Sequence, residues 1–188
     1  MKTVSPQEAV AALRAGNVAL VPTETVVGLV AAESGLSRIH EIKGRDADKP
    51  IALLCISAEE AFGLAANVPP LARDLAELYW PGPLTLVLDL PSGGTIGVRV
   101  PAGKAVRGLL EAYGSPLYAT SANLSGEPAK AVLDEVDPQV LESVDIVVGE
   151  ERGTGEASAV VDLAGGNVRL VRTAGELSAQ RLAQLAHG

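Results

Sequence analysis

The stretch SPQEAVAALRAGNVALVP, residues 5–22, joins a helix signature directly to a strand-like apolar run. Ser5 is a candidate N-cap, Pro6 suits the first helical position, and Glu8 completes a capping box. The run NVALVP that follows has the composition of a buried strand. A helix followed at once by a strand is the unit from which α/β folds are built.

Helical and strand-like patterns alternate through the rest of the chain. Helices are predicted over residues 36–44, 57–67, 69–80, 105–114 and 178–186, and Ser57 with Glu60 predicts a second capping box. Strands are predicted over residues 50–56, 84–90, 96–100, 116–120, 144–148, 158–163 and 168–172. Several strands follow one another without a helix, which favours a mixed sheet. We predict an α/β fold, a twisted mixed parallel and antiparallel sheet flanked by helices, as a single domain over residues 1–188.

The composition limits the function classes. The formal net charge is -8, and non-specific coating of nucleic acid is not expected because it needs a basic surface. The single cysteine, Cys55, lies in an apolar run and is interpreted as a packing residue, and two histidines make a structural zinc site unexpected. No apolar run can span a bilayer, and residues 1–10 lack the apolar core of a signal peptide, so we expect a cytoplasmic protein without a membrane partner.

Polar residues interrupt the apolar pattern at strand ends, where α/β proteins bind ligands. In VPTETVVGL, residues 21–29, Pro22 ends a strand and two threonines flank Glu24 ahead of Gly28. These hydroxyls predict either a site for a small polar ligand or a turn whose threonines cap a following helix. In YATSANLSG, residues 118–126, hydroxyl and amide groups directly follow a strand, which favours a cradle for an anion or a nucleotide.

The stretch KGRDADKP, residues 43–50, gathers Lys43, Arg45 and Lys49 near the end of a predicted helix. Such cations suit a phosphate chain, because arginine offers a planar fork and lysine a point charge. The alternative is a solvated helix end, where cations favour the negative end of the dipole and neighbouring aspartates pair with them. These residues alone leave both interpretations open.

Arg99 and Arg172 each stand in an otherwise apolar strand, and Ser158 begins a third such strand. A buried arginine needs a carboxylate, carbonyl groups or a bound anion, so each predicts either an internal salt bridge or an anion site. The sequence contains no G-x-x-x-x-G-K-[ST] loop, no G-x-G-x-x-G loop and no G-x-S-x-G elbow. Hydroxyls and cations without an acid–base pair suit chemistry that depends on positioning and on stabilising phosphate charge.

Seven short motifs occur along the chain in the order PTETVVGL, KGRDADKP, PGPLTLVL, GVRVP, ATSANLSGEPA, SAVVDL and VRTAG. Together they resemble the YrdC-like family of threonylcarbamoyl-AMP synthases, over about residues 5–175. The resemblance implies that L-threonine, bicarbonate and ATP give threonylcarbamoyl-AMP and pyrophosphate, with Mg²⁺ held mainly by the phosphates and no metal site on the protein. It also implies a separate downstream transferase that uses the product to form threonylcarbamoyladenosine (t6A) in tRNA, and some members bind double-stranded RNA.

The resemblance further implies which residues form the site, and Gly28 would let the backbone pass close to threonine. Threonine or its carbamate would be bound by Thr25, Arg99, Ser121 and Ser158; ATP would be bound by Lys43, Arg45, Lys49, Asn123 and Arg172; and Lys43 and Arg45 would be catalytic.

Three positions depart from the family pattern. Val27 replaces a usual Tyr or Phe, which is expected to remove a flat wall of the pocket. Leu54 stands where many members carry His or another polar residue, and Ala131 stands near a frequent Thr of the longer members, whose extra C-terminal domain is expected to be lacking here. Two alternatives stay open: a paralogue with a different carbamoyl acceptor, as in hydrogenase maturation, and a double-stranded RNA-binding module.

Overall fold

The computed structural model describes residues 3–44 and 51–186, so the predicted site residues Arg45 and Lys49 lie outside the described residues. The helices in this part of the chain are α1 (Pro6–Arg14), α2 (Leu36–Lys43), α3 (Ala58–Gly63), α4 (Pro70–Tyr79), α5 (Lys104–Tyr113), α6 (Pro138–Ser143) and α7 (Ala179–Ala186), with short 3-10 turns η1 (Glu33–Gly35), η2 (Leu133–Glu135) and η3 (Ala164–Gly166). The strands are β1 (Thr3–Val4), β2 (Val18–Pro22), β3 (Val27–Ala31), β4 (Ala52–Leu54), β5 (Leu84–Asp89), β6 (Thr95–Arg99), β7 (Leu117–Ser121), β8 (Ile146–Val148), β9 (Ala159–Asp162) and β10 (Arg169–Arg172).

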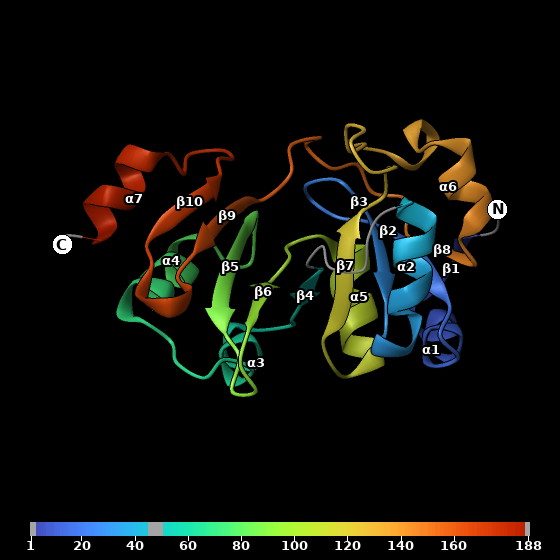
Figure 1. Cartoon of the computed structure of the whole chain (residues 1–188). Coiled ribbons are helices and arrows are strands. Elements are labelled where there is room, and N and C mark those ends of the chain that lie inside the picture. The colour runs from blue at the N-terminus through green and yellow to red at the C-terminus, as the bar shows by residue number, and fades with distance from the viewer. Residues whose placement is uncertain (1–2, 45–50, 187–188) are drawn as a thin grey trace.

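Within the described residues, all strands join one ten-stranded sheet in the order β1-β8-β2-β3-β7-β4-β6-β5-β9-β10. The pairs β1–β8, β2–β8, β4–β6 and β5–β9 are parallel, and the pairs β2–β3, β3–β7, β4–β7, β5–β6 and β9–β10 are antiparallel. The predicted mixed sheet is confirmed. Figure 1 shows that the sheet twists along its length, with β1 and α7 at opposite ends of the molecule.

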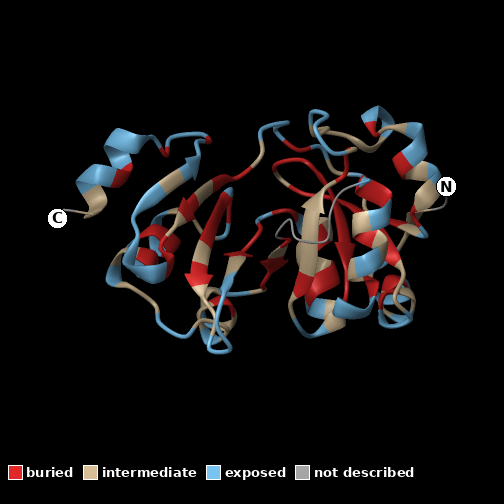
Figure 2. Cartoon of the chain, in the orientation of Figure 1, coloured by how far each residue is buried: buried red, intermediate tan, exposed pale blue. Residues whose placement is uncertain are grey.

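Three groups of apolar side chains bind the helices to the sheet. Helices α1 and α5 pack together on one face of β2 and β8, whereas α2 and α6 pack on the opposite face of this half. Helices α3, α4 and α7 pack on the half that contains β5, β6 and β9. Figure 2 shows the buried residues concentrated in the strands and on the inner sides of the helices. Nowhere in residues 3–44 and 51–186 is a helix long and apolar enough to cross a membrane.

Side chains of β5 point alternately into the core and into a cavity on the other face of the sheet. Leu84, Leu86 and Leu88 are buried in the apolar cluster that includes residues of α4. Successive side chains of a strand point to opposite faces, so Thr85 and Val87 lie on the other face of the sheet. There they line a cavity rather than packing under a helix.

The capping box predicted for α1 is confirmed, because Ser5 Oγ accepts a hydrogen bond from the Glu8 N–H while the Glu8 carboxylate accepts from the Ser5 N–H. The second predicted box is wrong in one half. Ser57 Oγ accepts from the Glu60 N–H at 3.1 Å, but the Glu60 carboxylate accepts from the N–H of Ile56, one residue before the cap. The side chain of Glu60 therefore secures the chain that leads into α3.

Strand β3 was not among the predicted strands. The turn after β2 leads directly into β3, and the two strands form an antiparallel hairpin in which Val21 pairs with Gly28. The alternative in which the threonines cap a following helix is therefore wrong. Within this turn the Thr23 hydroxyl bonds to the residues of the turn itself, and the hairpin places the turn at the edge of the cavity.

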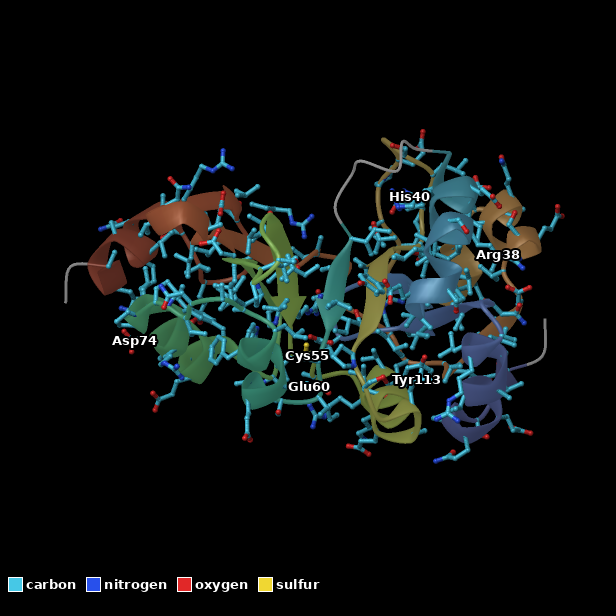
Figure 3. The ribbon with its side chains drawn as sticks, turned by 60° about the horizontal axis from the view of Figure 1, so that its bottom comes forward. Arg38, His40, Cys55, Glu60, Asp74 and Tyr113 are labelled. Atoms are coloured by element: carbon cyan, nitrogen blue, oxygen red, sulfur yellow. The ribbon has the colours of Figure 1, made fainter. Side chains whose placement is uncertain are left out.

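Cys55 is fully buried in the apolar cluster under α3 and α4, which confirms its interpretation as a packing residue. Figure 3 shows it near Glu60, the residue that secures the start of α3. Burial, with a further contribution from the charge of Glu60, raises the pKa of the Cys55 thiol to about 12. Because the thiolate is the reactive form, this side chain is inert at neutral pH.

Candidate active site

A cavity of about 500 Å³ lies over the sheet face that carries Ala52, Thr85 and Gly97. Its other walls come from the turn between β2 and β3, the end of β7 with the loop that follows it, the C-terminal end of α2, and the start of β9. Among the described residues, this lining contains three cations, Lys43, Arg99 and Arg172, many hydroxyls and no carboxylate. Since the whole chain has a formal net charge of -8, the cavity is a local positive region in an acidic protein.

The turn between β2 and β3 is held by the hydroxyl of Thr23. Thr23 Oγ1 lies 2.7 Å from the carbonyl oxygen of Val26, to which it donates its only proton. Thr25 Oγ1, which is 2.8 Å from Thr23 Oγ1, must then donate to it. Thr25 Oγ1 also accepts a hydrogen bond from Arg99 Nη2 at 3.0 Å, so one acceptor lone pair remains for a ligand.

Arg99, at the end of β6, has a buried side chain with three acceptors inside the protein. Its Nε donates to the carbonyl of Gly82 at 3.1 Å, and its Nη2 donates to both Glu24 Oε1 at 2.6 Å and Thr25 Oγ1. The salt bridge with Glu24 agrees with the first prediction for Arg99, an internal ion pair. Arg99 also lines the cavity, as the second prediction, an anion site, requires. The residue therefore combines an internal ion pair with a cation presented to a ligand.

Ser158, Thr85 and Arg172 form a hydroxyl–guanidinium cluster at the side of the cavity formed by β5, β9 and β10. Ser158 Oγ lies 2.9 Å from Thr85 Oγ1 and accepts from Arg172 Nη2 at 3.2 Å, while Arg172 Nε donates to the Ser158 carbonyl at 2.7 Å. Partial burial, and then the positive charge of Arg99, lower the pKa of the Arg172 guanidinium. Arg99 and Arg172 both line the cavity, where a bound anion would relieve their repulsion.

Lys43, the last residue of α2, is buried and bound to the loop after β7. Its Nζ donates to the carbonyl oxygens of Ser121 at 2.5 Å and Asn123 at 2.8 Å, and lies 3.3 Å from Asn123 Oδ1. The Asn123 amide nitrogen in turn donates to the carbonyls of Leu124 and Glu127. Lys43 thus stabilises the shape of this loop, and its charge is close to the cavity that it lines.

The structure brings together the predicted site residues that it describes: Thr25, Lys43, Arg99, Ser121, Asn123, Ser158 and Arg172 all line the cavity. One expectation about them was wrong, because Arg172 is largely exposed and only its contacts with Ser158 are partly buried. Sequence reasoning missed Thr85 and assigned no role to Glu24. For Thr85 a signal existed, since it is the hydroxyl residue in the otherwise apolar start of LTLVLD.

The three departures from the family pattern lie in different environments. Val27 is fully buried in the apolar cluster with Leu29 and residues of α2, and it does not line the cavity. Its neighbours Val26 and Gly28 line the cavity instead. Leu54 does line the cavity, whereas Ala131 contributes a carbonyl oxygen that accepts from the Gly153 N–H.

A second hollow of about 660 Å³ lies near α3, α4 and the start of α5. It is larger than the first, but it contains none of the predicted site residues. Its two arginines, Arg73 and Arg107, are accompanied by Glu59 and Glu77, so it has no excess of positive charge. Convergent hydroxyls and unbalanced cations favour the first cavity as the candidate site.

The ion pair of Glu24 predicts a pH-dependent contribution to stability. Burial raises the Glu24 pKa, but the charge and hydrogen bond of Arg99, with backbone N–H groups, outweigh it and lower the pKa below the ordinary 4.5. A carboxyl with a lowered folded-state pKa stabilises the fold above its unfolded value, and this stabilisation is lost as the pH falls through the folded value. Urea titrations give the difference in unfolding free energy between wild type and Glu24→Gln. We expect this difference to be constant near neutral pH and to decrease when the pH is lowered below about 4.5. A difference independent of pH would contradict this ion pair.

The chain is similar to several known proteins. The Sua5_yciO_yrdC family model, whose description is "Telomere recombination", matches residues 11–174. The chain is 38% identical over 164 residues to the threonylcarbamoyl-AMP synthase of Pyrococcus abyssi, covering 80% of this chain and 48% of that protein, so it spans about half the length of this relative. It is 36% identical over 185 residues to the threonylcarbamoyl-AMP synthase of Stenotrophomonas maltophilia, covering 89% of this chain and 98% of that protein.

Among solved structures, P. abyssi Sua5 complexed with L-threonine matches with a TM-score of 0.85 and 34% sequence identity, covering 96% of this chain and 56% of that chain. The family model covers most of the present chain, and the Stenotrophomonas protein is matched over nearly its whole length. The resemblance noted from the seven motifs is confirmed: this chain belongs to the Sua5/YciO/YrdC family.

Proposed function

We propose that this chain is a threonylcarbamoyl-AMP synthase, which makes threonylcarbamoyl-AMP and pyrophosphate from L-threonine, bicarbonate and ATP. The observation that carries the proposal is the cavity lining, which contains three cations and, among the described residues, no carboxylate, in a chain of net charge -8. A carboxylate, a carbamate and a triphosphate are the anions of this reaction, and each favours such a lining. Relatives named for this activity, and a relative bound to L-threonine, support the choice of substrate.

The lining residues of the cavity would divide between the two larger substrates, threonine and ATP. Thr25 and Arg99 would bind threonine, Ser158 would also contact it, and Ser121 would contact its carbamate. Arg172, Asn123 and Lys43 would lie along the nucleotide, with Arg45 and Lys49, from outside the described residues, as further phosphate ligands. Because Lys43 and Asn123 already bond to the loop after β7, their first contribution is to fix that loop.

The chemistry requires alignment and charge stabilisation. The amine of threonine captures bicarbonate as a carbamate, with loss of water, and a carbamate oxygen then attacks the α-phosphorus of ATP. The bond to the β-phosphate oxygen breaks, and pyrophosphate leaves. No covalent enzyme intermediate is needed, since the protein aligns the reactants and stabilises the phosphate charge that spreads in the transition state.

Magnesium enters this proposal as part of the ATP complex. Among the described residues, the lining of the cavity offers Mg²⁺ no carboxylate ligand, and no cluster of three acidic, histidine or cysteine side chains is present. Mg²⁺ commonly binds proteins through substrate phosphates, which fits such a lining. The product would pass to a separate transferase that forms t6A in tRNA.

The proposal is tested by pyrophosphate release from ATP with bicarbonate and a panel of amino acids. Threonine is expected to stimulate release, serine and valine much less, and removal of bicarbonate is expected to abolish the stimulation. Release driven by an amino acid other than threonine would identify a paralogue with a different acceptor. Binding of ATP without any amino acid-dependent release would contradict the synthase.

Strand β10 offers a matched pair of arginines for a test of the nucleotide wall. Arg172 lines the cavity, whereas Arg169 on the same strand pairs with Asp162 at 3.0 Å and is exposed. We expect Arg172→Gln to raise KM for ATP by roughly tenfold or more, the effect of losing a charge-assisted hydrogen bond, and Arg169→Gln to change it little. Equal KM values for ATP in the two variants, measured in steady-state assays, would show that Arg172 does not bind the nucleotide.

A further inference from the structure

The carboxylate of Glu24 lies behind the cavity wall rather than in it. Oε1 accepts from Arg99 Nη2 at 2.6 Å, and Oε2 accepts from the N–H of Gly103, the N-cap of α5, at 3.0 Å. The Glu24 carbonyl accepts from the Thr154 N–H in the segment that joins β8 to β9. Glu24 therefore connects the turn between β2 and β3 to β6, to α5 and to this segment.

These contacts fix the direction of the Arg99 guanidinium. Its Nε is held by the Gly82 carbonyl and its Nη2 by Glu24 and Thr25. A guanidinium is planar, so fixing Nε and Nη2 also fixes Nη1. Among residues 3–44 and 51–186, no hydrogen-bond acceptor contacts Nη1. Nη1 is also not one of the fully buried polar atoms that lack a partner. Since Arg99 lines the cavity, Nη1 is the nitrogen of this side chain that can donate a hydrogen bond to a ligand.

The position of the negative charge matters as much as its presence. Glu24 partly neutralises the charge of Arg99, with which it forms an ion pair at 2.6 Å. A carboxylate inside the cavity would do the same but would repel anionic substrates. Arg99 and the backbone N–H groups keep the Glu24 pKa below its ordinary value, so the group is ionised at neutral pH.

We propose that Glu24 is a positioning residue that acts through Arg99: from behind the wall it fixes the guanidinium so that Nη1 is presented to the carboxylate of the bound amino acid. This inference rests on the proposed function for the identity of that ligand. It assigns Glu24 no contact with the substrate. Its role is to make threonine enter with its carboxylate at Arg99, and its effect must therefore disappear when Arg99 is removed.

The kinetic test uses Glu24→Gln, which keeps the size and one acceptor but removes the charge. We expect KM for threonine to rise roughly tenfold or more while kcat and KM for ATP change little, because one charge-assisted hydrogen bond to the threonine-binding cation is weakened. In an Arg99→Met background, Glu24→Gln is expected to change kcat/KM for threonine by less than about twofold, since the two residues act as one unit. Asp162→Asn, which breaks an exposed arginine–aspartate pair outside the cavity, is the control and should leave all three parameters unchanged.

A second readout does not depend on turnover. In ¹⁵N-detected spectra of arginine side chains, the Arg99 Nη signals are identified by their loss in Arg99→Met. We expect these signals to be resolved in wild type and to merge in Glu24→Gln as the guanidinium begins to rotate.

Independent effects of the two substitutions, or an equal rise in KM for ATP and threonine, would overturn the positioning role. If wild type forms no product but the Arg99 signals still depend on Glu24, the proposed function fails and the positioning role stands. Normal turnover with unchanged signals and KM in Glu24→Gln would refute the positioning role alone.

Discussion

Replacing Gly153 with alanine is expected to reduce threonine-dependent activity at least a hundredfold while leaving a folded protein. Gly153 lies in the segment between β8 and β9, where its N–H donates to the Ala131 carbonyl and the following N–H groups of Thr154 and Gly155 donate to the carbonyls of Glu24 and Thr25. A Cβ at Gly153 would lie 2.9 Å from the Thr23 carbonyl oxygen and closer still to that of Thr25. The turn that presents the Thr25 hydroxyl would have to move, and misplacement of a binding group by about 1 Å can cost a hundredfold in rate.

The measurement is kcat/KM for threonine, with urea unfolding in parallel. Overpacking of this kind is expected to lower the unfolding free energy by about 1–3 kcal/mol. Gly63→Ala is the matched control, because no atom lies within 4 Å of a Cβ added there in α3. That variant should keep full activity and gain roughly 0.5–1 kcal/mol of stability. Wild-type activity in Gly153→Ala would show that this segment does not hold the turn.

Replacing Arg99 with methionine is expected to lower kcat/KM for threonine by roughly a thousandfold, the upper range for loss of one preorganised donor to a charged group. Binding of ATP is expected to persist, because the residues that we propose to bind the nucleotide lie on other elements. The substitution leaves the Glu24 carboxylate without its cation, and we expect the double variant Arg99→Met with Glu24→Gln to unfold at higher urea than Arg99→Met alone.

The experiment combines steady-state kinetics with calorimetric binding of threonine and of ATP to each variant. Arg169→Met is the control, since it removes an exposed arginine whose ion pair with Asp162 lies outside the cavity. A KM for threonine that is unchanged in Arg99→Met would place the carboxylate of the substrate elsewhere. Equal loss of ATP and threonine binding would indicate that Arg99 acts only on the fold.

The parts of the fold that were predicted from the sequence have strong local signals. Ser5, Pro6 and Glu8 define the start of α1, and the apolar runs of β2 and β5 lie between turn residues. Strand β3 was missed because its partner turn, PTET, contains none of the Gly or Asn residues that mark short hairpins, and because Gly28 interrupts the strand pattern. Strand β1 has two residues and exists only through its pairing with β8, which no local pattern reveals.

The candidate site was predictable in its members but not in its contacts. Thr25, Arg99 and Ser158 were selected as polar residues at strand ends, and the sheet order brings them together. The bond between Glu24 and Arg99 joins residues 75 positions apart, and only the tertiary structure shows it. Strand alternation explains the place of Val27: its neighbour Gly28 lines the cavity, and Val27 on the other face of β3 packs in the core.

Mass spectrometry of the nucleotide product formed from ATP, threonine and ¹³C-bicarbonate tests the proposed synthesis. We expect a single new nucleotide that contains threonine joined to AMP through one labelled carbon. This product should be absent when bicarbonate is withheld and nearly absent with Arg99→Met. Release of AMP and pyrophosphate without a labelled threonine adduct would refute the proposed synthesis, because the cavity would then bind ATP without performing it.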